Sequence, residues 1–320
     1  MIKLKFRNEH IFHLLLLPGV ILVLIYNYIP MAGIVMAFKR FSPSKGMFGS
    51  PWAGWDHFVY MLSMPNIYQV LWNTIFISAM KIIALAVVPV VFALLLNEVK
   101  NRLIKRSVQT IVYFPHFLSW IILGGIFIDI LSPSEGIVNR LLQSIGIEPV
   151  YFLGDKSWFP FTLVGTEIWK EFGYGMIVYL AALAGVDPSL YESAVMDGAG
   201  RWKQTLHITL PNLVPMMVLM TILSLGNVLN AGFDQVFNLY SPQVYVSGDI
   251  IDTLVYRIGV QDAQYEVATA VGLFKSVVSL LLLSGSYALA YRYTDYRIFL
   301  EKFRYDVIVQ IAPMNLFIFA

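Results

Sequence analysis

The sequence predicts an all-α membrane protein with six transmembrane helices. Of the 320 residues, 58% are hydrophobic and only 13% are charged, whereas soluble domains carry about 25% charged residues. Mean hydropathy is correspondingly high, at +0.69. Crossing a hydrocarbon core of about 30 Å takes roughly 20 helical residues, and six apolar stretches are long enough. They cover approximately residues 11–37, 69–96, 107–131, 160–184, 205–229 and 269–291.

The first stretch is expected to stay in the membrane as an uncleaved span. Three basic residues precede it, as in a signal peptide, but the stretch is too long for a signal-peptide core. Pro18 and Gly19 fall inside it, and no small-residue cleavage site follows.

The next spans include three prolines, Pro89, Pro115 and Pro215. Neighbouring helices can satisfy the backbone groups that a proline leaves unpaired, so these prolines are compatible with membrane helices. The longest connections, 38–68, 132–159 and 230–268, are rich in Gly, Pro, Ser, Asn and aromatic residues. They are too short for a soluble domain, and we expect packed surface loops with short helices.

The distribution of Lys and Arg predicts the orientation. Thirteen fall in the N-terminal segment, loop 97–106, segment 185–204 and the tail after Tyr291, and six fall in the alternate loops. Positive residues collect on the cytoplasmic side of membrane proteins. Both termini and segment 185–204 are therefore expected in the cytoplasm.

Several kinds of chemistry find no support in the sequence. The chain has no cysteine, so disulfides and thiolate chemistry are excluded. It has no G-x-x-x-x-G-K-[ST] phosphate loop, so it does not hydrolyse ATP by that route. Of the five histidines, only His10 and His13 are spaced as a ligand pair, and an interfacial position suits them better than a metal. We expect no catalytic residue, no metal site and no cofactor in this chain.

Between the fourth and fifth spans, residues 191–211 read YESAVMDGAGRWKQTLHITLP. Before them, Asp187 and Pro188 favour a helix start, as an acidic N-cap and a proline at the first helical position. Tyr191, Ala194, Val195 and Gly198 are spaced to share one helix face. The small residues allow another protein to approach the backbone closely, and Trp202, Leu206 and Ile208 could wedge a second helix against the bundle.

This segment resembles the coupling loop, or EAA loop, of permease subunits of binding-protein-dependent ABC importers. The resemblance is carried by Glu192-Ser193-Ala194, Gly198 and the Ile208-x-Leu210-Pro211 end; Ser193 and Thr205 depart slightly from the usual pattern. An ordinary amphipathic loop helix is the alternative. The resemblance implies the type I ABC importer permease fold, seen in maltose and methionine permeases, and a cytoplasmic ATPase that docks on this loop. The residues implied in coupling are Glu192, Ser193, Ala194, Asp197, Gly198, Ala199 and Trp202.

A second stretch, 230–276, narrows the family. Its blocks GFDQVFNL, DIIDTLVYR and ATAVGLFKS resemble sugar permeases grouped with polysaccharide and oligosaccharide importers, including alginate permeases. That subgroup implies a second, homologous permease subunit, two ATPase subunits that carry ATP and Mg, and an external solute-binding protein. We expect three regions: 1–68 with an N-terminal cytoplasmic segment, the first span and an outer loop, 69–298 as the transmembrane domain with the coupling loop at 187–211, and a tail at 299–320.

Charged and amide side chains inside or beside the spans are candidates for the substrate pathway, because intramembrane charge is costly. A structural alternative is an ion pair in which Lys81 or Lys275 neutralises Glu167 or Glu171. Aromatic residues of the fourth span (Trp169, Phe172, Tyr174 and Tyr179) suit helix packing as well as sugar stacking. The pathway candidates are Asn73, Lys81, Glu167, Lys170, Asn227, Asn230 and Asp234.

Together these features predict a permease subunit, not itself an enzyme, that moves oligosaccharides or polysaccharide fragments across the bacterial inner membrane by alternating access. If the substrate is a uronate, the intramembrane lysines are candidate carboxylate partners. Two alternatives remain. One is an ABC importer permease for an amino acid, peptide or other small solute. The other is an ion-coupled secondary transporter using Glu167 and Glu171, although the sequence shows no internal inverted repeat.

Overall fold

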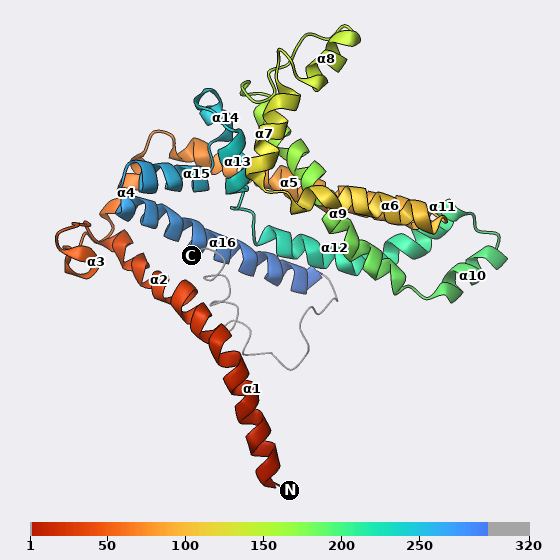
Figure 1. Cartoon of the computed structure of the whole chain (residues 1–320), viewed down its shortest axis with the longest axis horizontal. Coiled ribbons are helices and arrows are strands. Elements are labelled where there is room, and N and C mark those ends of the chain that lie inside the picture. Colours follow the sequence, from red (N-terminus) through yellow and green to blue (C-terminus); the bar gives the residue numbers. More distant parts are fainter. Residues whose placement is uncertain (1, 294–320) are drawn as a thin grey trace. The chain divides into compact units, whose positions relative to one another are not determined.

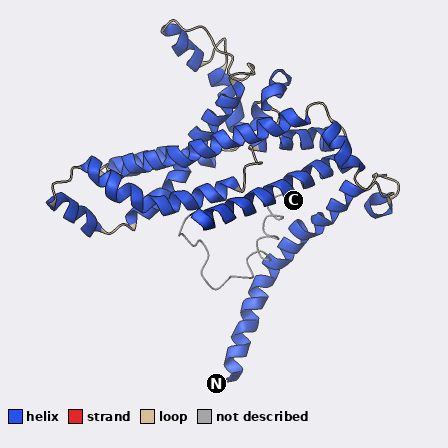
Figure 2. Cartoon of the chain, turned by 180° about the vertical axis from the view of Figure 1, so that it is seen from behind, coloured by secondary structure: helices blue, strands red, loops and turns tan. Residues whose placement is uncertain are grey.

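The computed structural model describes residues 2–293 (Figure 1), and within that range every regular segment is a helix (Figure 2). The predicted all-α class is confirmed. An isolated antiparallel bridge joins Lys39 and Trp52. The expected tail at 299–320 lies outside the described residues.

Among residues 2–293, four helical stretches are long and apolar enough to cross a membrane singly, and the number rises to six if each of two bent helix pairs is one span. The single stretches are Phe12–Phe38, Ile67–Asn97, Arg201–Leu225 and Tyr265–Ser286. The pairs are Arg102–Phe117 with Trp120–Leu131, bent by 104°, and Phe159–Ala184 with Pro188–Met196, bent by 70°. The first, second, fifth and sixth predicted spans match single helical stretches to within about five residues at each end. The third matches the first bent pair, and the fourth matches the helix Phe159–Ala184 of the second pair.

The long helices are α1 (Ile2–Val23), α5 (Ile67–Asn97), α6 (Arg102–Tyr113), α7 (Trp120–Leu131), α9 (Phe159–Ala184), α12 (Leu210–Leu225) and α16 (Tyr265–Tyr293). Short α-helices are α2 (Ile29–Met31), α3 (Gly46–Gly49), α4 (Asp56–Ser63), α8 (Ile137–Ser144), α10 (Pro188–Met196), α11 (Arg201–Gln204), α13 (Phe233–Leu239), α14 (Tyr245–Gly248) and α15 (Ile251–Tyr256). Tighter or wider turns are η1 (Leu24–Tyr28), η2 (Ala32–Phe38), η3 (Phe114–Phe117), η4 (Thr205–Thr209), η5 (Pro242–Val244) and η6 (Arg257–Gln261). The long connections thus hold short helices, as predicted.

The described residues form two compact units. One comprises residues 2–64 and 255–280, and the other comprises 65–254 and 281–293. In the first unit, Phe38 stacks on Trp52 at 5.8 Å between ring centroids and meets Trp55 edge-on at 5.5 Å. Both tryptophans are exposed, as in the aromatic belts of membrane proteins.

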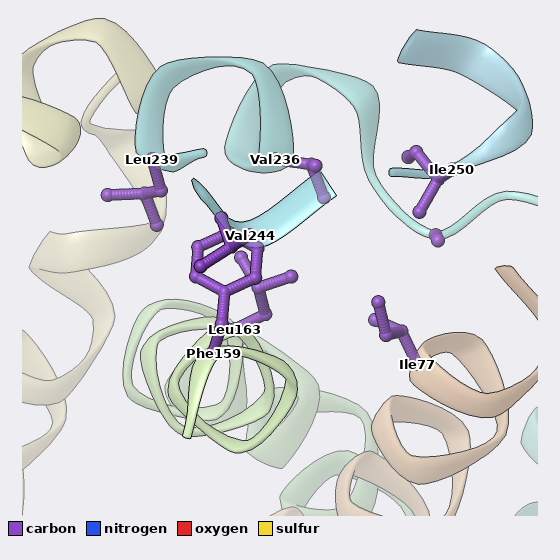
Figure 3. Packing of buried hydrophobic residues seen from close by; sticks show 8 residues of the cluster. Ile77, Phe159, Leu163, Val236, Leu239, Val244 and Ile250 are labelled. Atoms are coloured by element: carbon purple, nitrogen blue, oxygen red, sulfur yellow. The ribbon is translucent and has the colours of Figure 1, made fainter. Parts of the chain in front are cut away.

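The second unit contains the coupling segment and the pathway candidates. Its first core joins Ile77 of α5 and Phe159 and Leu163 of α9 to side chains that follow α12 (Figure 3). Gly248 makes this packing possible, because a Cβ there would lie 2.2 Å from the Phe159 ring. The remaining members of this core are Ala231, Val236, Leu239, Val244 and Ile250.

A second core lies further along the same helices, where α5 and α9 meet α12. It includes Val90 and Ala93 of α5, Met176 and Leu183 of α9, and Leu213 of α12. The proline inside α5 is accommodated here, because Gly175 of α9 leaves room for the Pro89 ring; a Cβ would lie 3.2 Å from it. Close packing by a partner helix is the condition under which a membrane helix tolerates proline.

The third span differs from the prediction of one continuous helix over 107–131. The chain breaks after η3, at Leu118 and Ser119, where both residues are extended. Pro115 lacks an N–H and sits at the start of η3, where none is needed. Ser119 then caps α7 by accepting the N–H of Ile122 at 3.4 Å. Apolar length alone could not reveal this break.

Candidate functional site

The segment between the fourth and fifth spans forms a helix with a well-defined start. The Oδ1 of Asp187 accepts the backbone N–H of Ser189 at 2.9 Å, and Pro188 occupies the first turn of α10. That hydrogen bond lowers the pKa of the Asp187 carboxyl. The carboxylate is thus charged at neutral pH, and its negative charge interacts favourably with the positive end of the helix dipole. The N-cap expected from Asp187-Pro188 is confirmed.

The end of α10 corrects one expectation. The helix stops at Met196, and Gly198 has a φ of +74°, so it lies beyond the helix and does not continue the face of Tyr191 and Ala194. The N–H of Ala199 donates to the carbonyl of Ala194 at 2.8 Å and closes the last turn. Glycine adopts this left-handed conformation without a Cβ penalty, which explains the sharp turn into α11.

One face of α10 is held by the chain and the other is free. The Tyr191 hydroxyl lies 3.1 Å from the Thr209 hydroxyl, and Ala194 is half-buried. The predicted coupling residues Glu192, Ser193, Asp197 and Gly198 are all exposed, whereas Ala199 is half-buried.

The free face also carries large apolar side chains. Val195 is 61% exposed and Met196 is 87% exposed. Trp202 is 74% exposed, so it does not wedge α11 against the bundle as expected. The Gln204 amide instead closes the loop by donating to the Ala199 carbonyl at 2.8 Å. Sequence reasoning missed Met196, although three apolar side chains on an otherwise polar loop are a usable signal for a docking surface.

Inside the second unit, Lys81 of α5 is the centre of a polar cluster. Its ammonium donates to the Ala231 carbonyl at 2.7 Å, makes a short hydrogen bond to the Gln235 Oε1, and lies 3.4 Å from the Glu167 carboxylate. Gln235 connects Lys81 to α9, because its amide nitrogen donates to the Thr166 hydroxyl and the Leu163 carbonyl, both at 2.7 Å. The structural ion pair expected between Lys81 and Glu167 is therefore present.

A second polar cluster joins α9 to the break in the third span. Lys170 lies 2.6 Å from the Oε1 of its neighbour Glu171, and the Oε2 of Glu171 lies 2.7 Å from the His116 Nδ1. Because a carboxylate only accepts hydrogen bonds, the His116 Nδ1 carries the proton. Sequence analysis did not anticipate the Lys170–Glu171 pair or the part played by His116.

The amide and acidic candidates divide by exposure. Asn73 is buried, and its amide nitrogen donates to the carbonyls of Val246 and Asp249, both at 3.1 Å. Asn227, Asn230 and Asp234 are exposed; the two asparagines lie in the turn between α12 and α13, and Asp234 lies in the first turn of α13. The structure thus joins Lys81 and Glu167 to this turn through Ala231 and Gln235, and it places Lys170 in the other cluster.

The aromatic residues of the fourth span make packing contacts within the unit. Phe172 meets Phe92 at 4.7 Å between centroids, and Trp169 meets Phe127 edge-on at 5.5 Å. Tyr174 stacks on the His116 ring. These contacts favour the packing alternative for the three residues. Among residues 2–293, no group of three or more metal-binding side chains occurs.

The chain is similar to membrane components of known transport systems. Residues 86–293 match the family described as binding-protein-dependent transport system inner membrane component. The chain is 40% identical to Protein LplB of Bacillus subtilis, over 92% of each chain. It is 39% identical to the polygalacturonan/rhamnogalacturonan transport system permease protein YteP of the same organism, over 91% of each chain.

Solved structures give the same result. The chain is similar to a subunit of a bacterial ABC transporter involved in the import of the acidic polysaccharide alginate, with 39% identity and a TM-score of 0.83, over 91% of this chain and 98% of that one. A second structure shows a bacterial alginate transporter in complex with an alginate pentasaccharide-bound periplasmic protein; its matching chain is 38% identical, with a TM-score of 0.83 over 92% and 98%.

Proposed function

This chain belongs to the family of inner membrane components of binding-protein-dependent transport systems, and we propose that it imports oligosaccharides or polysaccharide fragments with a second permease subunit. The observation that carries the proposal is the likeness, over 91% of this chain, to a subunit of an alginate importer, together with a capped, exposed α10. The fold is that of a type I ABC importer permease. The named relatives favour a saccharide over the amino acid, peptide and ion-coupled alternatives.

We infer that α10 docks on a cytoplasmic ATPase subunit. Glu192, Ser193 and Asp197 supply polar contacts at its free face, and Met196 and Trp202 supply apolar area to bury. Gly198 and the neighbouring Ala194 and Ala199 keep the backbone accessible, as the coupling-loop resemblance implies. The ATPases bind ATP and Mg, and this chain converts their movement into rearrangement of the spans without making or breaking bonds.

The substrate pathway is proposed to run past the turn between α12 and α13. Asn227, Asn230 and Asp234 are exposed there, and a saccharide leaving water needs such groups to replace its hydrogen bonds. We propose that four further residues hold the wall of this pathway in place: Asn73, Lys81, Glu167 and Lys170. The charges of Lys81 and Lys170 are matched by carboxylates of this chain, so a uronate would have to compete with those carboxylates.

The remaining parts of the proposal concern location and partners. The chain is proposed to lie in the bacterial inner membrane with both termini and α10 in the cytoplasm, as the charge distribution predicts. A solute-binding protein delivers substrate from outside; the alginate transporter solved with its periplasmic protein supports this partner. The two permeases form a heterodimer over two ATPases.

The test is reconstitution with the permease, ATPase and solute-binding proteins encoded beside this chain. The binding protein is loaded in turn with alginate oligosaccharides, oligogalacturonates, neutral malto-oligosaccharides or an amino acid. We expect one saccharide class to stimulate ATP hydrolysis and to accumulate in the vesicles. Stimulation by the amino acid alone, or uptake driven by an ion gradient without ATP, would contradict the proposal.

A further inference from the structure

The break in the third span poses a physical problem for a membrane protein. The helices α6 and α7 meet at 104°, and the chain between them is extended at Leu118 and Ser119. A break frees carbonyl groups that would have been paired in a continuous helix. In a membrane each unpaired group is costly, so non-helical backbone survives only where protein groups or water satisfy it.

Lys170 of α9 contacts the chain on both sides of this break. Its ammonium donates to the carbonyl of His116, just before the break, at 3.0 Å. The same ammonium lies 5.8 Å from the centre of the Trp120 ring, just after the break, within the range of a cation–π contact. Lys170 is itself buried. One side chain of α9 thus contacts both arms of the bend.

The neighbours of Lys170 fix its position and balance its charge. Glu171 contacts the Lys170 ammonium through one oxygen and the His116 ring through the other. Tyr174, one turn later, stacks on the His116 ring with 4.0 Å between centroids and 6° between planes. A charged group held on several sides is far more restricted than an exposed ion pair.

Backbone packing brings α9 against the arm that precedes the break. A Cβ on Gly173 would lie 2.1 Å from the Val112 carbonyl oxygen, so glycine alone permits this approach of α6. The arm after the break meets α9 through Phe127 and Trp169, and it also packs against α13: a Cβ on Gly124 of α7 would lie 3.0 Å from the Asn238 Cβ of α13. The bend therefore links α9 to the segment beside Asp234.

The C-terminal end of α9 is joined to α10, the proposed docking helix, by a three-residue connection. We propose that Lys170, Glu171 and His116 form a clamp that keeps the bend of the third span rigid, so that movement of α10 is passed through α9 and α7 to α13. The proposal rests on the proposed function for the movement, but the three residues lie outside the coupling-loop motif. They act as positioning residues, and they require no contact with substrate.

The first test uses the complete complex reconstituted in vesicles. Lys170→Met keeps the length of the side chain but removes the donor and the charge. We expect oligosaccharide uptake to fall about tenfold, an effect within the range seen for residues along a coupling path, and the ratio of uptake to ATP hydrolysis to fall with it. Lys170→Arg should restore more than half of the uptake. Lys156→Met, which removes an exposed lysine, is the matched control.

The second test measures the bend itself in the same complex. Because this chain has no cysteine, Ser107→Cys on α6 and Ile128→Cys on α7 are its only labelling sites, and the purified chain can be spin-labelled before it is assembled with cysteine-free versions of its partners. The distance distribution across the break should be narrow in the parent and in Lys170→Arg, and broader in Lys170→Met. A structural role without coupling would leave the ratio of uptake to hydrolysis unchanged.

The outcomes separate the two proposals. If the parent complex shows no saccharide-stimulated hydrolysis, the proposed function fails. If the parent works and Lys170→Met matches it in uptake and distances, only the clamp is overturned. If Lys170→Met does not assemble, Lys170→Met with Glu171→Gln removes the stranded charge and is measured instead. If that double variant also fails to assemble while Lys170→Arg succeeds, the cluster serves stability and the clamp is overturned.

Discussion

Lys81 offers the sharpest prediction about what holds the turn between α12 and α13. In Lys81→Met, a side chain of similar length replaces the ammonium and cannot donate. The Ala231 carbonyl and the Gln235 Oε1 then lose their buried donor, and Glu167 loses its counter-charge.

The magnitude follows from the burial of these groups. An acceptor left unsatisfied in the interior costs about 1–3 kcal/mol, and breaking a buried ion pair costs about 3–5 kcal/mol. The pair belongs at the low end, because its atoms are 3.4 Å apart and the Glu167 side chain is 18% exposed. We therefore expect Lys81→Met to destabilise the complex by about 5 kcal/mol: about 3 kcal/mol for the pair and about 1 kcal/mol for each of the two acceptors.

Thermal unfolding of the purified complex measures this loss. A loss of that size should lower the apparent Tm by roughly 10–20 °C, by the scaling of soluble domains of about 150–250 residues. Adding Glu167→Gln removes the stranded carboxylate, so the double variant should be less destabilised than the sum of the single ones. Lys156→Met, at an exposed site, should leave Tm unchanged. An unchanged Tm in Lys81→Met would refute the prediction that Lys81 holds the turn between α12 and α13 in place.

Four further changes probe other parts of the account. Gly173→Ala should force α6 and α9 apart and lower the stability by about 1–3 kcal/mol, seen as a lower Tm. An unshifted Tm would mean that the two helices can separate at this contact without loss of stability. Asn230→Ala should lower uptake about tenfold with stability within about 0.5 kcal/mol, as for other exposed sites, and normal uptake would move the pathway elsewhere. Asp187→Ala should speed backbone amide hydrogen exchange in the first turn of α10, whereas Asp187→Asn keeps an N-cap and should not. Equal exchange rates in the two variants would show that the cap does not stabilise α10. An impermeant maleimide added outside intact cells should label Ser134→Cys and spare Ser193→Cys, and the reverse pattern would invert the topology.

Much of the fold could be predicted because membrane helices are specified locally. The length of an apolar run fixes a span, and Asp187 with Pro188 fixes a helix start through neighbouring backbone groups. Gly198 shows the limit of a periodic pattern. Its spacing fits the face of α10, but its left-handed backbone ends the helix first.

The site was less predictable because its contacts join distant parts of the sequence. Lys81 and Gln235 are 154 positions apart, and His116 and Glu171 are 55 positions apart. Local patterns showed that Lys81 needs a partner but could not choose between partners. Trp202 was misplaced for a related reason: an aromatic side chain on a loop suits the bundle as well as a partner protein, and only the folded chain shows it exposed.

The most direct test of the central claim is ATP-driven oligosaccharide uptake by the reconstituted complex with α10 altered. Gly198 has open space around it in the chain, so the side chain of Gly198→Trp would obstruct a partner without meeting an atom of this subunit, although its left-handed backbone strains any side chain there. Gly198→Asn is the control, because asparagine tolerates the left-handed conformation. The account predicts uptake that requires ATP and loaded binding protein, is retained by Gly198→Asn and is lost in Gly198→Trp although the chain still inserts. Normal coupled uptake by Gly198→Trp, or uptake by the parent without ATP, would contradict it.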